Sequence, residues 1–520
     1  MIHPMPLRAT SLNAVRRETE LAELAGGLQV DVLVVGGGVT GTGAALDAAT
    51  RGLSVALVEA NDLAFGTSRW SSKLVHGGLR YLANGDVGLA RESAVERHLL
   101  MTRIAPHLTR TLTQLVPLHA GVSTRDAALT FAGLAAGDLL RRSAGTPTAL
   151  LPPPRRVSVP ESLALAPGLA RPGLRGGLLG FDGALTDDAR LVVALARTAA
   201  GLGARVLTRT RVTALTDDGA EVVDTLTGTA ALIRARSVVN ATGVWAGELV
   251  ESVRLRPSRG SHLVLDAASV GIGDTGLTIP VAGRFGRYVL LLPQPDGRVY
   301  LGLTDEPVDG PAPDVPVVPE SDVDFLLSVA GTALDRPLTR ADVRGSFAGL
   351  RPLVDAPGRG GRGADLSRHH VVRVSAHRVV TVVGGKLTTY RRMAQDAVDA
   401  AVAAAGLPAG PSRSRRTPLV GADARTRLGR LIAARRLVGR YGTEAERVAA
   451  IGELDADLAR TVAPGSPITA AEVVWAVRHE GALDTEDVLD RRTRIGLVAE
   501  DADAARPVVA DLVTRTRAGL

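Results

Sequence analysis

The chain has 520 residues, which allows about three domains of ~150 residues, and its 45% hydrophobic and 22% charged content is typical of a globular protein. Cysteine is absent, which excludes disulfides, thiolate metal ligands and thiol catalysis and leaves any redox chemistry to a bound cofactor. The net charge of +7 fits nucleic acid, an anionic membrane surface or an anionic substrate, but aromatic residues make up 3% of the chain, so nucleic-acid binding is not expected.

No membrane-spanning segment is expected. The nearest candidate, at 127–137, is shorter than the ~18 apolar residues that span a bilayer, and Asp138 follows it. Residues 1–29 contain arginines and acids without an apolar centre, so we expect an N-terminal extension, helical at 11–24, and no secretory signal. These two expectations predict a cytoplasmic protein.

The first motif is an apolar run at 32–35 followed by the glycine-rich turn at 36–41 and an alanine-rich helix. Gly36 allows a tight turn, Gly38 lets the backbone approach a diphosphate, and Gly41 lets the helix lie against the strand. A second strand at 53–58 ends at Glu59, whose carboxylate can accept hydrogen bonds from a ribose diol. The stretch predicts a dinucleotide site for FAD or NAD and disfavours NADP.

Lysine is almost absent from this chain. Of the 61 lysines and arginines, only Lys73 and Lys386 are lysines, and both lie in glycine-containing motifs. A lysine is a compact donor whose pKa can be tuned by burial, which a guanidinium cannot match. We therefore expect each lysine to act close to a cofactor.

The segment at 71–82, Ser-Ser-Lys-Leu-Val-His-Gly-Gly-Leu-Arg-Tyr-Leu, resembles the stretch that runs past the isoalloxazine ring in the FAD-dependent glycerol-3-phosphate dehydrogenases. Gly-Gly-Lys-Leu-Thr-Thr-Tyr-Arg at 384–391 is the most specific further match. Three shorter motifs also match, at 238–245, 259–262 with 303–305, and 349–353. The resemblance extends from about residue 30 to about residue 500, and it departs from the family's small residues at Arg69 and Trp70.

The resemblance implies an α/β fold. It has a Rossmann-type FAD-binding domain of the two-dinucleotide-binding-domain, D-amino-acid-oxidase-like class, an inserted α+β substrate domain and a C-terminal helical domain. The boundaries that we expect are 30–95, 180–255 and 345–405 for the FAD-binding domain, 96–179 and 256–344 for the substrate domain, and 406–520 for the helical domain.

The family activity implied for this chain is hydride transfer from C2 of sn-glycerol 3-phosphate to flavin N5, giving dihydroxyacetone phosphate. Arg80, Arg351 and Arg368 are the expected phosphate ligands, and Tyr81 would line the pocket. Arg351 also counts among the catalytic residues, and Lys386 would donate to the flavin or to the substrate oxygen. His76 and His262 are both candidates for the base, with His262 also contacting the substrate.

The residues expected to contact FAD come from the glycine turns and the segments next to them. They are Gly36, Gly38, Gly41, Glu59, Thr67, Ser68, Ser72, Lys73, Leu74, His76, Gly77, Val212, Ala241, Gly243, Gly385, Lys386, Leu387 and Thr388. No metal is expected, because adjacent histidines at 369–370 on an extended segment point to opposite faces.

Three other functions remain as alternatives. The same fold could pass electrons to oxygen, could bind a nucleotide without catalysis, or could oxidise amines or amino acids. Amine and amino-acid oxidases bind a carboxylate and need fewer cations than Arg80, Arg351 and Lys386 provide together. The sequence therefore favours a phosphorylated substrate.

The resemblance implies that electrons pass to a membrane quinone, which requires peripheral attachment in the absence of a spanning helix. Arginines in flexible-looking segments could reach the inner, anionic face of the cell membrane. They are Arg359, Arg362, Arg413, Arg415 and Arg416. An arginine-rich surface without a membrane role is the alternative, and a homodimer is left open.

Overall fold

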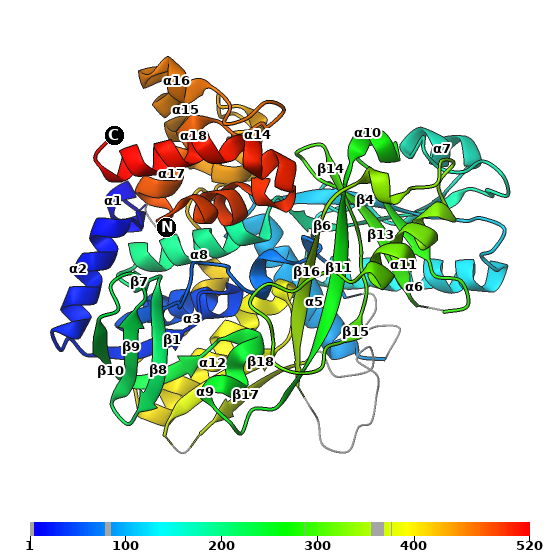
Figure 1. Cartoon of the computed structure of the whole chain (residues 1–520). Coiled ribbons are helices and arrows are strands. Elements are labelled where there is room, and N and C mark those ends of the chain that lie inside the picture. Colours follow the sequence, from blue (N-terminus) through cyan, green and yellow to red (C-terminus); the bar gives the residue numbers. More distant parts are fainter. Residues whose placement is uncertain (1–4, 79–84, 285, 355–368, 376) are drawn as a thin grey trace.

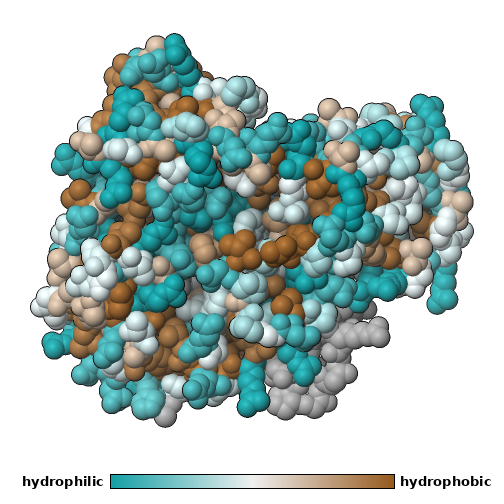
Figure 2. Space-filling model, viewed as in Figure 1, coloured by the Kyte–Doolittle hydropathy of each residue, from teal (hydrophilic) through white to brown (hydrophobic). Residues whose placement is uncertain are grey.

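The computed structural model describes residues 5–78, 85–284, 286–354, 369–375 and 377–520. Figure 1 shows two sheet-containing regions side by side, with a group of C-terminal helices packed over one end of the pair. In Figure 2 polar residues cover most of the same face, with groups of apolar residues between them. In the described part of the chain, no helix combines the length and the apolar composition that crossing a membrane requires.

The first region is an eight-stranded sheet whose central strands are parallel. Its main order is β17 (His370–Val374), β18 (Val379–Gly384), β10 (Ala230–Asn240), β1 (Val30–Val35), β2 (Val55–Val58) and β7 (Arg205–Leu207). β8 (Thr210–Thr216) and β9 (Gly219–Asp224) extend it from β10. Val34 of β1 pairs with Val239 on one side and with Leu57 on the other, so β1 lies at the centre.

Both faces of this sheet are buried, which explains why β1 is a continuous apolar run rather than an alternating one. Val34 and Leu57 face a core shared with α3 (Val39–Thr50), α8 (Asp188–Gly201) and α12 (Tyr390–Ala405). Leu33 and Ala56 face a second core that includes Leu24 of α2 (Ala14–Ala25). The observed α2 begins three residues later than expected from the sequence, because the side chain of Asn13 caps it by accepting from the Arg16 amide at 3.0 Å.

The second region is a ten-stranded sheet. Its main order is β15 (Glu306–Pro307), β11 (Leu255–Asp266), β14 (Arg298–Gly302), β13 (Tyr288–Pro293), β12 (Gly276–Pro280), β4 (Thr109–Pro117), β6 (Gly177–Leu185) and β3 (Leu74–Val75). β16 (Val343–Val354) pairs with β11, and β5 (Arg155–Val157) pairs with β6. β3 and most of β16 come from ranges expected for the FAD-binding domain, and the domain boundaries stay a prediction.

One face of the ten-stranded sheet packs on α7 (Val159–Leu165), α10 (Ala267–Val270) and α11 (Glu320–Gly331). Alternate strand residues such as Leu291 and Leu301 point into this core, where Leu326 of α11 is fully buried. The opposite residues face α5 (Val87–Leu99), α6 (Thr124–Ser143) and the first region.

The C-terminal helices form a separate packing unit. They include α14 (Arg435–Tyr441), α15 (Ala445–Leu454), α16 (Ala456–Ala459), α17 (Ala470–His479) and α18 (Ala499–Arg517), with a π-helical turn at Asp487–Thr493. Trp475 of α17 is 1% exposed and packs edge to face on Tyr441 at 6.3 Å. The π-helical turn reaches down to the first region through a set of arginines.

Candidate active site

A cavity of about 1520 Å³ lies where the two sheets meet. Its walls come from the turn between β1 and α3, the chain after β2, the ends of β10 and β16, and the turn between β18 and α12. The volume exceeds the ~300–1,000 Å³ of an ordinary ligand pocket, so the cavity has room for more than one ligand.

The glycine turn after β1 shapes one end of the cavity. Gly36 has φ of 111°, and a Cβ there would lie 2.6 Å from the carbonyl oxygen of Ala241. A Cβ on Gly41 would collide with the carbonyl oxygen of Gly36, so α3 can approach the turn only with glycine there. Gly38 caps α3 and lines the cavity together with Val39, so the helix N-terminus faces a space that fits a diphosphate.

Glu59 stands at the end of β2, on the cavity wall. Its Oε2 accepts from the Gly37 amide at 2.6 Å and its Oε1 accepts from the Asn61 amide at 2.8 Å. A carboxylate has about four acceptor positions, so two remain for a ribose diol. Burial raises the pKa of Glu59, while the two amide bonds favour its ionised form.

A second pair of turns meets the first. Ala241 and Gly243 follow β10, where the side chain of Asn240 accepts from the Thr242 hydroxyl at 2.7 Å and fixes the turn. A 3₁₀ turn at Leu387–Thr389 connects Gly385 to α12, so that another helix N-terminus faces the cavity. Gly385 has φ of 68°, and a Cβ there would meet the Met393 sulfur. The other expected cofactor residues on these walls are Val212, Lys386, Leu387 and Thr388.

The chain between 66 and 76 forms the middle of the cavity wall. The Ser68 hydroxyl accepts from the Val39 amide at 2.9 Å, and the Thr67 hydroxyl donates to the Leu350 carbonyl at 2.7 Å. These two bonds join the first glycine turn to β16. Ser72, Leu74 and His76 line the cavity further along.

Lys73 and Gly77, two expected cofactor residues, do not line the cavity. Lys73 is 2% exposed and lies beneath the loop, with Nζ 2.8 Å from the Asp188 carboxylate and 2.9 Å from the Arg69 carbonyl oxygen. Burial lowers the pKa of Lys73 to about 8. In this position Lys73 holds the loop in shape. The position does not support the prediction that Lys73 contacts the cofactor directly.

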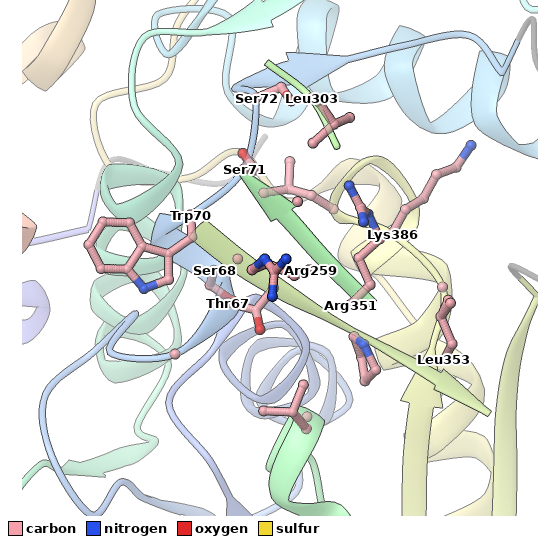
Figure 3. Close-up of a pocket in the computed structure, with 18 of the residues that line it drawn as sticks. Thr67, Ser68, Trp70, Ser71, Ser72, Arg259, Leu303, Arg351, Leu353 and Lys386 are labelled. Carbon is pink, nitrogen blue, oxygen red and sulfur yellow. The ribbon is translucent and has the colours of Figure 1, made fainter. Parts of the chain in front are cut away.

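Two arginines line the other end of the cavity from adjacent strands, and both are labelled in Figure 3 among the residues of its wall. Arg351 of β16 donates to Ser258 Oγ at 3.2 Å, to Asp305 Oδ1 at 3.1 Å and to the Thr304 carbonyl at 3.1 Å. Its guanidinium is therefore held in one orientation. A Cβ on Gly260 would collide with this guanidinium, so β11 needs glycine opposite it.

Arg259 was not expected in the site from the sequence. It lies on β11, lines the cavity, and donates from Nε to Asp322 Oδ2 at 3.2 Å. In sequence, Arg259 lies beside the motif residues Gly260 and His262, which is a signal for a role in the site. The signal is weak because most arginines of this chain are surface residues. Trp245 and Leu303 also line the cavity without having been predicted to do so.

His262 is 1% exposed and stacks on Phe347, with ring centroids 4.6 Å apart. Its Nε2 lies 2.8 Å from Ser72 Oγ. Burial, together with the positive charges of Lys73 and Arg351, lowers the pKa of His262 to about 3, so the ring is neutral at neutral pH. His76 lines the same cavity, so both candidate bases border it.

Lys386 lies at the start of the turn before α12, and its amine donates to Ser93 Oγ of α5. Arg80, Tyr81 and Arg368 lie outside the described residues, as do Arg359 and Arg362.

The two adjacent histidines contact different acids. His369 lies 2.6 Å from Asp86, and His370 lies 2.8 Å from Asp396. Among the residues that the structure describes, no three His, Asp or Glu side chains gather as metal ligands.

Comparison with known proteins gives consistent matches. The model of the FAD dependent oxidoreductase family matches residues 31–391, and the C-terminal domain of alpha-glycerophosphate oxidase matches residues 412–517. The chain is 52% identical to glycerol-3-phosphate dehydrogenase 1 of Mycobacterium tuberculosis over 98% of this chain and 99% of that protein. It is 37% identical to glycerol-3-phosphate dehydrogenase of Mycobacterium leprae over 92% of this chain and 85% of that protein.

Solved structures with a similar fold agree with these sequence matches. The structure of glycerol-3-phosphate dehydrogenase from Bacillus halodurans complexed with FAD superposes with a TM-score of 0.72 at 26% identity, covering 96% of this chain and 94% of that one. L-alpha-glycerophosphate oxidase from Mycoplasma pneumoniae has the same fold, with a TM-score of 0.56 at 20% identity over 75% of this chain and 99% of that one.

Proposed function

Since the chain belongs to the FAD-dependent oxidoreductases and, within them, to the glycerol-3-phosphate dehydrogenase family, we propose that it oxidises sn-glycerol 3-phosphate to dihydroxyacetone phosphate. The predicted family, fold class and FAD cofactor are thereby confirmed. The observation that carries the substrate proposal is the cavity itself, which has a glycine cradle at one end and an oriented arginine at the other.

The residues of the cavity fit FAD. Gly36 and Gly38 at the N-terminus of α3 would hold the diphosphate, and Glu59 would accept from the ribose. Gly385 and Leu387, before α12, would lie along the ring system. When bound, FAD supplies a two-electron acceptor for a hydride taken from an alcohol carbon.

The substrate carries a phosphate and a secondary alcohol, and the two need different partners. Arg351 can bind the phosphate with two parallel N–H donors, because Ser258 and Asp305 already hold its guanidinium. Oxidation of the alcohol releases a proton as well as a hydride, so a base must face the C2 hydroxyl. His262 is neutral, but its pKa of about 3 makes it a weak base, and His76, which borders the same cavity, is the alternative.

For the electrons we propose a membrane quinone as acceptor, with the protein attached peripherally to the inner face of the cell membrane. The net charge of +7 supports this, as does the exposure of Arg413, Arg415 and Arg416. Oxygen as acceptor is the competing possibility.

Anaerobic mixing tests the substrate. The holoprotein should lose the visible absorbance of oxidised flavin rapidly on addition of sn-glycerol 3-phosphate and far more slowly with glycerol, which lacks the phosphate. Retention of the colour with both compounds would refute the proposed reaction. Under air, stoichiometric peroxide with no quinone reduction would identify an oxidase instead.

A further inference from the structure

Lys73 is one of only two lysines in the chain, yet its side chain lies beneath the cavity wall and not in the cavity. Its Nζ lies 2.8 Å from the carboxylate of Asp188, which begins α8 and has no exposed surface. A buried ion pair adds little stability by itself, because the loss of hydration offsets much of the attraction. No step of the proposed reaction uses the pair, so its role remains to be explained.

Asp188 connects Lys73 to the cavity wall through Ser71. Asp188 Oδ2 accepts from the Ser71 amide at 2.9 Å and from the Ser71 hydroxyl at 2.7 Å. Ser71 Oγ accepts in turn from the Lys73 amide at 3.0 Å. Lys73 has φ of 59°, a left-handed conformation that a residue other than glycine keeps only when its surroundings hold it there. The turn at 71–73 is therefore held in its shape by one buried carboxylate.

The main chain of Lys73 is held by the same stretch of chain as its side chain. Its carbonyl oxygen accepts from the amide of Leu185, three residues before Asp188, at 2.7 Å. The next two residues form β3, which pairs with residues 183–184 of β6. One short segment at 183–188 thus holds the Lys73 amine, the Lys73 carbonyl and the strand that follows.

The segment fixed in this way presents two side chains to the cavity. Ser72 lines the cavity and places its Oγ 2.8 Å from His262 Nε2, and His76 follows directly after β3 (Figure 3 labels Ser72). His262 is itself confined, since its ring stacks on Phe347 and a Cβ on Gly302 would collide with it. Because the ring is fixed, the Ser72 hydroxyl meets it only while the turn keeps its shape.

The space around the Lys73 amine explains why this position has lysine in a chain that is rich in arginine. Nζ lies 5.3 Å from the centre of the Phe347 ring and 5.8 Å from the centre of the Tyr300 ring, and both rings are buried. A compact ammonium reaches Asp188 and the Arg69 carbonyl in this space, whereas a guanidinium is larger and has its donors in a fixed fork. Burial lowers the pKa of Lys73 to about 8, so the amine is still charged at neutral pH.

We propose that Lys73 is a positioning residue for the dehydrogenase reaction; this inference rests on the proposed function. Its ion pair with Asp188 holds the turn at 71–73, so that Ser72 stays against His262 and His76 stays at the cavity wall. Lys73 itself contacts neither FAD nor substrate. The pair therefore acts on the rate of hydride transfer and has little effect on the binding of the phosphate, for which Arg351 is proposed.

Replacing the ion pair by apolar side chains tests the proposal. Lys73→Met/Asp188→Leu leaves no unpaired charge in the core, and Asp187 still caps α8, so the fold should persist. The same change removes the acceptor of the Ser71 amide. We expect FAD to stay bound and the limiting rate of anaerobic flavin reduction by sn-glycerol 3-phosphate to fall about 10²-fold, with less than about a threefold change in the substrate Kd from the same stopped-flow data.

Arg197→Met/Glu444→Leu is the matched control, because it removes another ion pair of α8 whose residues do not line the cavity. The limiting rate of flavin reduction should be unchanged in this control. Amide hydrogen exchange gives a second readout that needs no activity. In Lys73→Met/Asp188→Leu the amides of Ser71 and Lys73 should exchange at least ~10-fold faster than in the control, because both lose the contacts that hold the turn.

Ser71→Ala is a milder variant that keeps the ion pair and removes one link to the turn. It should lower the limiting rate about fivefold, the loss expected for one neutral hydrogen bond.

Two results would overturn the proposal. One is an unchanged rate of flavin reduction in flavin-loaded Lys73→Met/Asp188→Leu or in Ser71→Ala. The other is an equal loss of rate in the Arg197→Met/Glu444→Leu control, which would show that the pair only stabilises α8. If the unmodified holoprotein fails to reduce its flavin with sn-glycerol 3-phosphate, the dehydrogenase function fails, and the exchange rates alone then decide whether the pair holds the turn.

Discussion

Arg351 shows how one residue type can serve in two ways. Many arginines here form ion pairs away from the cavity, whereas the guanidinium of Arg351 lines the cavity and is oriented by Ser258, Asp305 and the Thr304 carbonyl. Arg351→Lys should lower kcat/KM for sn-glycerol 3-phosphate by about 10- to 100-fold, because a point charge replaces a two-pronged contact. Steady-state kinetics with glycerol, which lacks the phosphate, should change little.

Arg340→Lys is the control for this substitution, since Arg340 is exposed, pairs with Glu320 and Asp324, and is not among the residues that line the cavity. Equal losses of kcat/KM on both substrates in Arg351→Lys would show that Arg351 holds the structure and does not bind the phosphate.

The environment of His262 makes a prediction about pH. A base must be unprotonated to act, and the pKa of His262 is lowered to about 3 by burial and nearby positive charge. If His262 is the base, kcat at saturating substrate should therefore stay level from about pH 8 to about pH 5, and His262→Gln should lower it by ~10²- to 10⁴-fold. A fall in kcat centred near pH ~6.5, the ordinary histidine value, that disappears in His76→Gln would assign the role to His76.

The residues that sequence could place are those whose role is local. Gly41 is required by its backbone contact with Gly36, five residues earlier, and Gly36 by its own φ of 111°, so a short motif predicts both. The role of Lys73 depends on Asp188, and that of Arg259 on Asp322, both far away in sequence. No local sequence pattern indicates which acidic residue will pair with a buried cation. For this reason the sequence predicted a cofactor contact for Lys73 and no role for Arg259.

Among the elements, the π-helical turn at Asp487–Thr493 supports the cavity wall from behind. Arg491 and Arg492 donate to the fully buried Asp62 at 2.6 and 2.8 Å, and Asp490 pairs with Arg69 at 3.0 Å. Asp62 and Arg69 flank the segment whose residues Phe65, Gly66 and Thr67 line the cavity. The C-terminal helices therefore fix the loop that lines this part of the cavity.

Arg492→Met should weaken both the fold and FAD binding. Removing one partner of a buried ion pair costs ~3–5 kcal/mol, because Asp62 keeps a charge that Arg491 alone compensates. We expect a lower Tm and a faster release of FAD, measured by the rise in flavin fluorescence. The double variant Asp62→Leu/Arg492→Met should be less destabilised than Arg492→Met, because it leaves no unpaired charge. An unchanged rate of FAD release in Arg492→Met would separate the turn from the cofactor loop.

Elements whose residues repeat with a clear period were predictable. The strands β1 and β2 and the helix α3 are close to where their apolar patterns placed them. Which sheet each strand joins was harder to predict from the sequence. β3 and β16 adjoin the cofactor motifs in sequence, yet both pair into the ten-stranded sheet, since pairing is decided by partners more than 75 residues away.

At the scale of the whole molecule, the cavity exists because two sheets contribute different chemistry to one space. The parallel sheet supplies glycine turns and helix N-termini, and the antiparallel strands β11 and β16 supply arginines and a buried histidine. The sequence contains both sets of motifs, and the family resemblance was needed to place them together.

The last prediction concerns the surface of the whole protein and a membrane. Arg415 and Arg416 are exposed on the turn at Ser414–Arg416, and both contribute to the net charge of +7. Each cation near an anionic leaflet contributes ~1 kcal/mol, so Arg415→Gln/Arg416→Gln should weaken binding to phosphatidylserine-containing vesicles by roughly 30-fold at low salt. Arg336→Gln/Arg340→Gln, which removes the same charge from arginines already paired with Asp342 and Glu320, should have a much smaller effect. Cosedimentation measures both, and high salt should release the protein because exposed charges are screened. A protein that stays in the supernatant at low salt would refute peripheral attachment and leave the flavin chemistry intact.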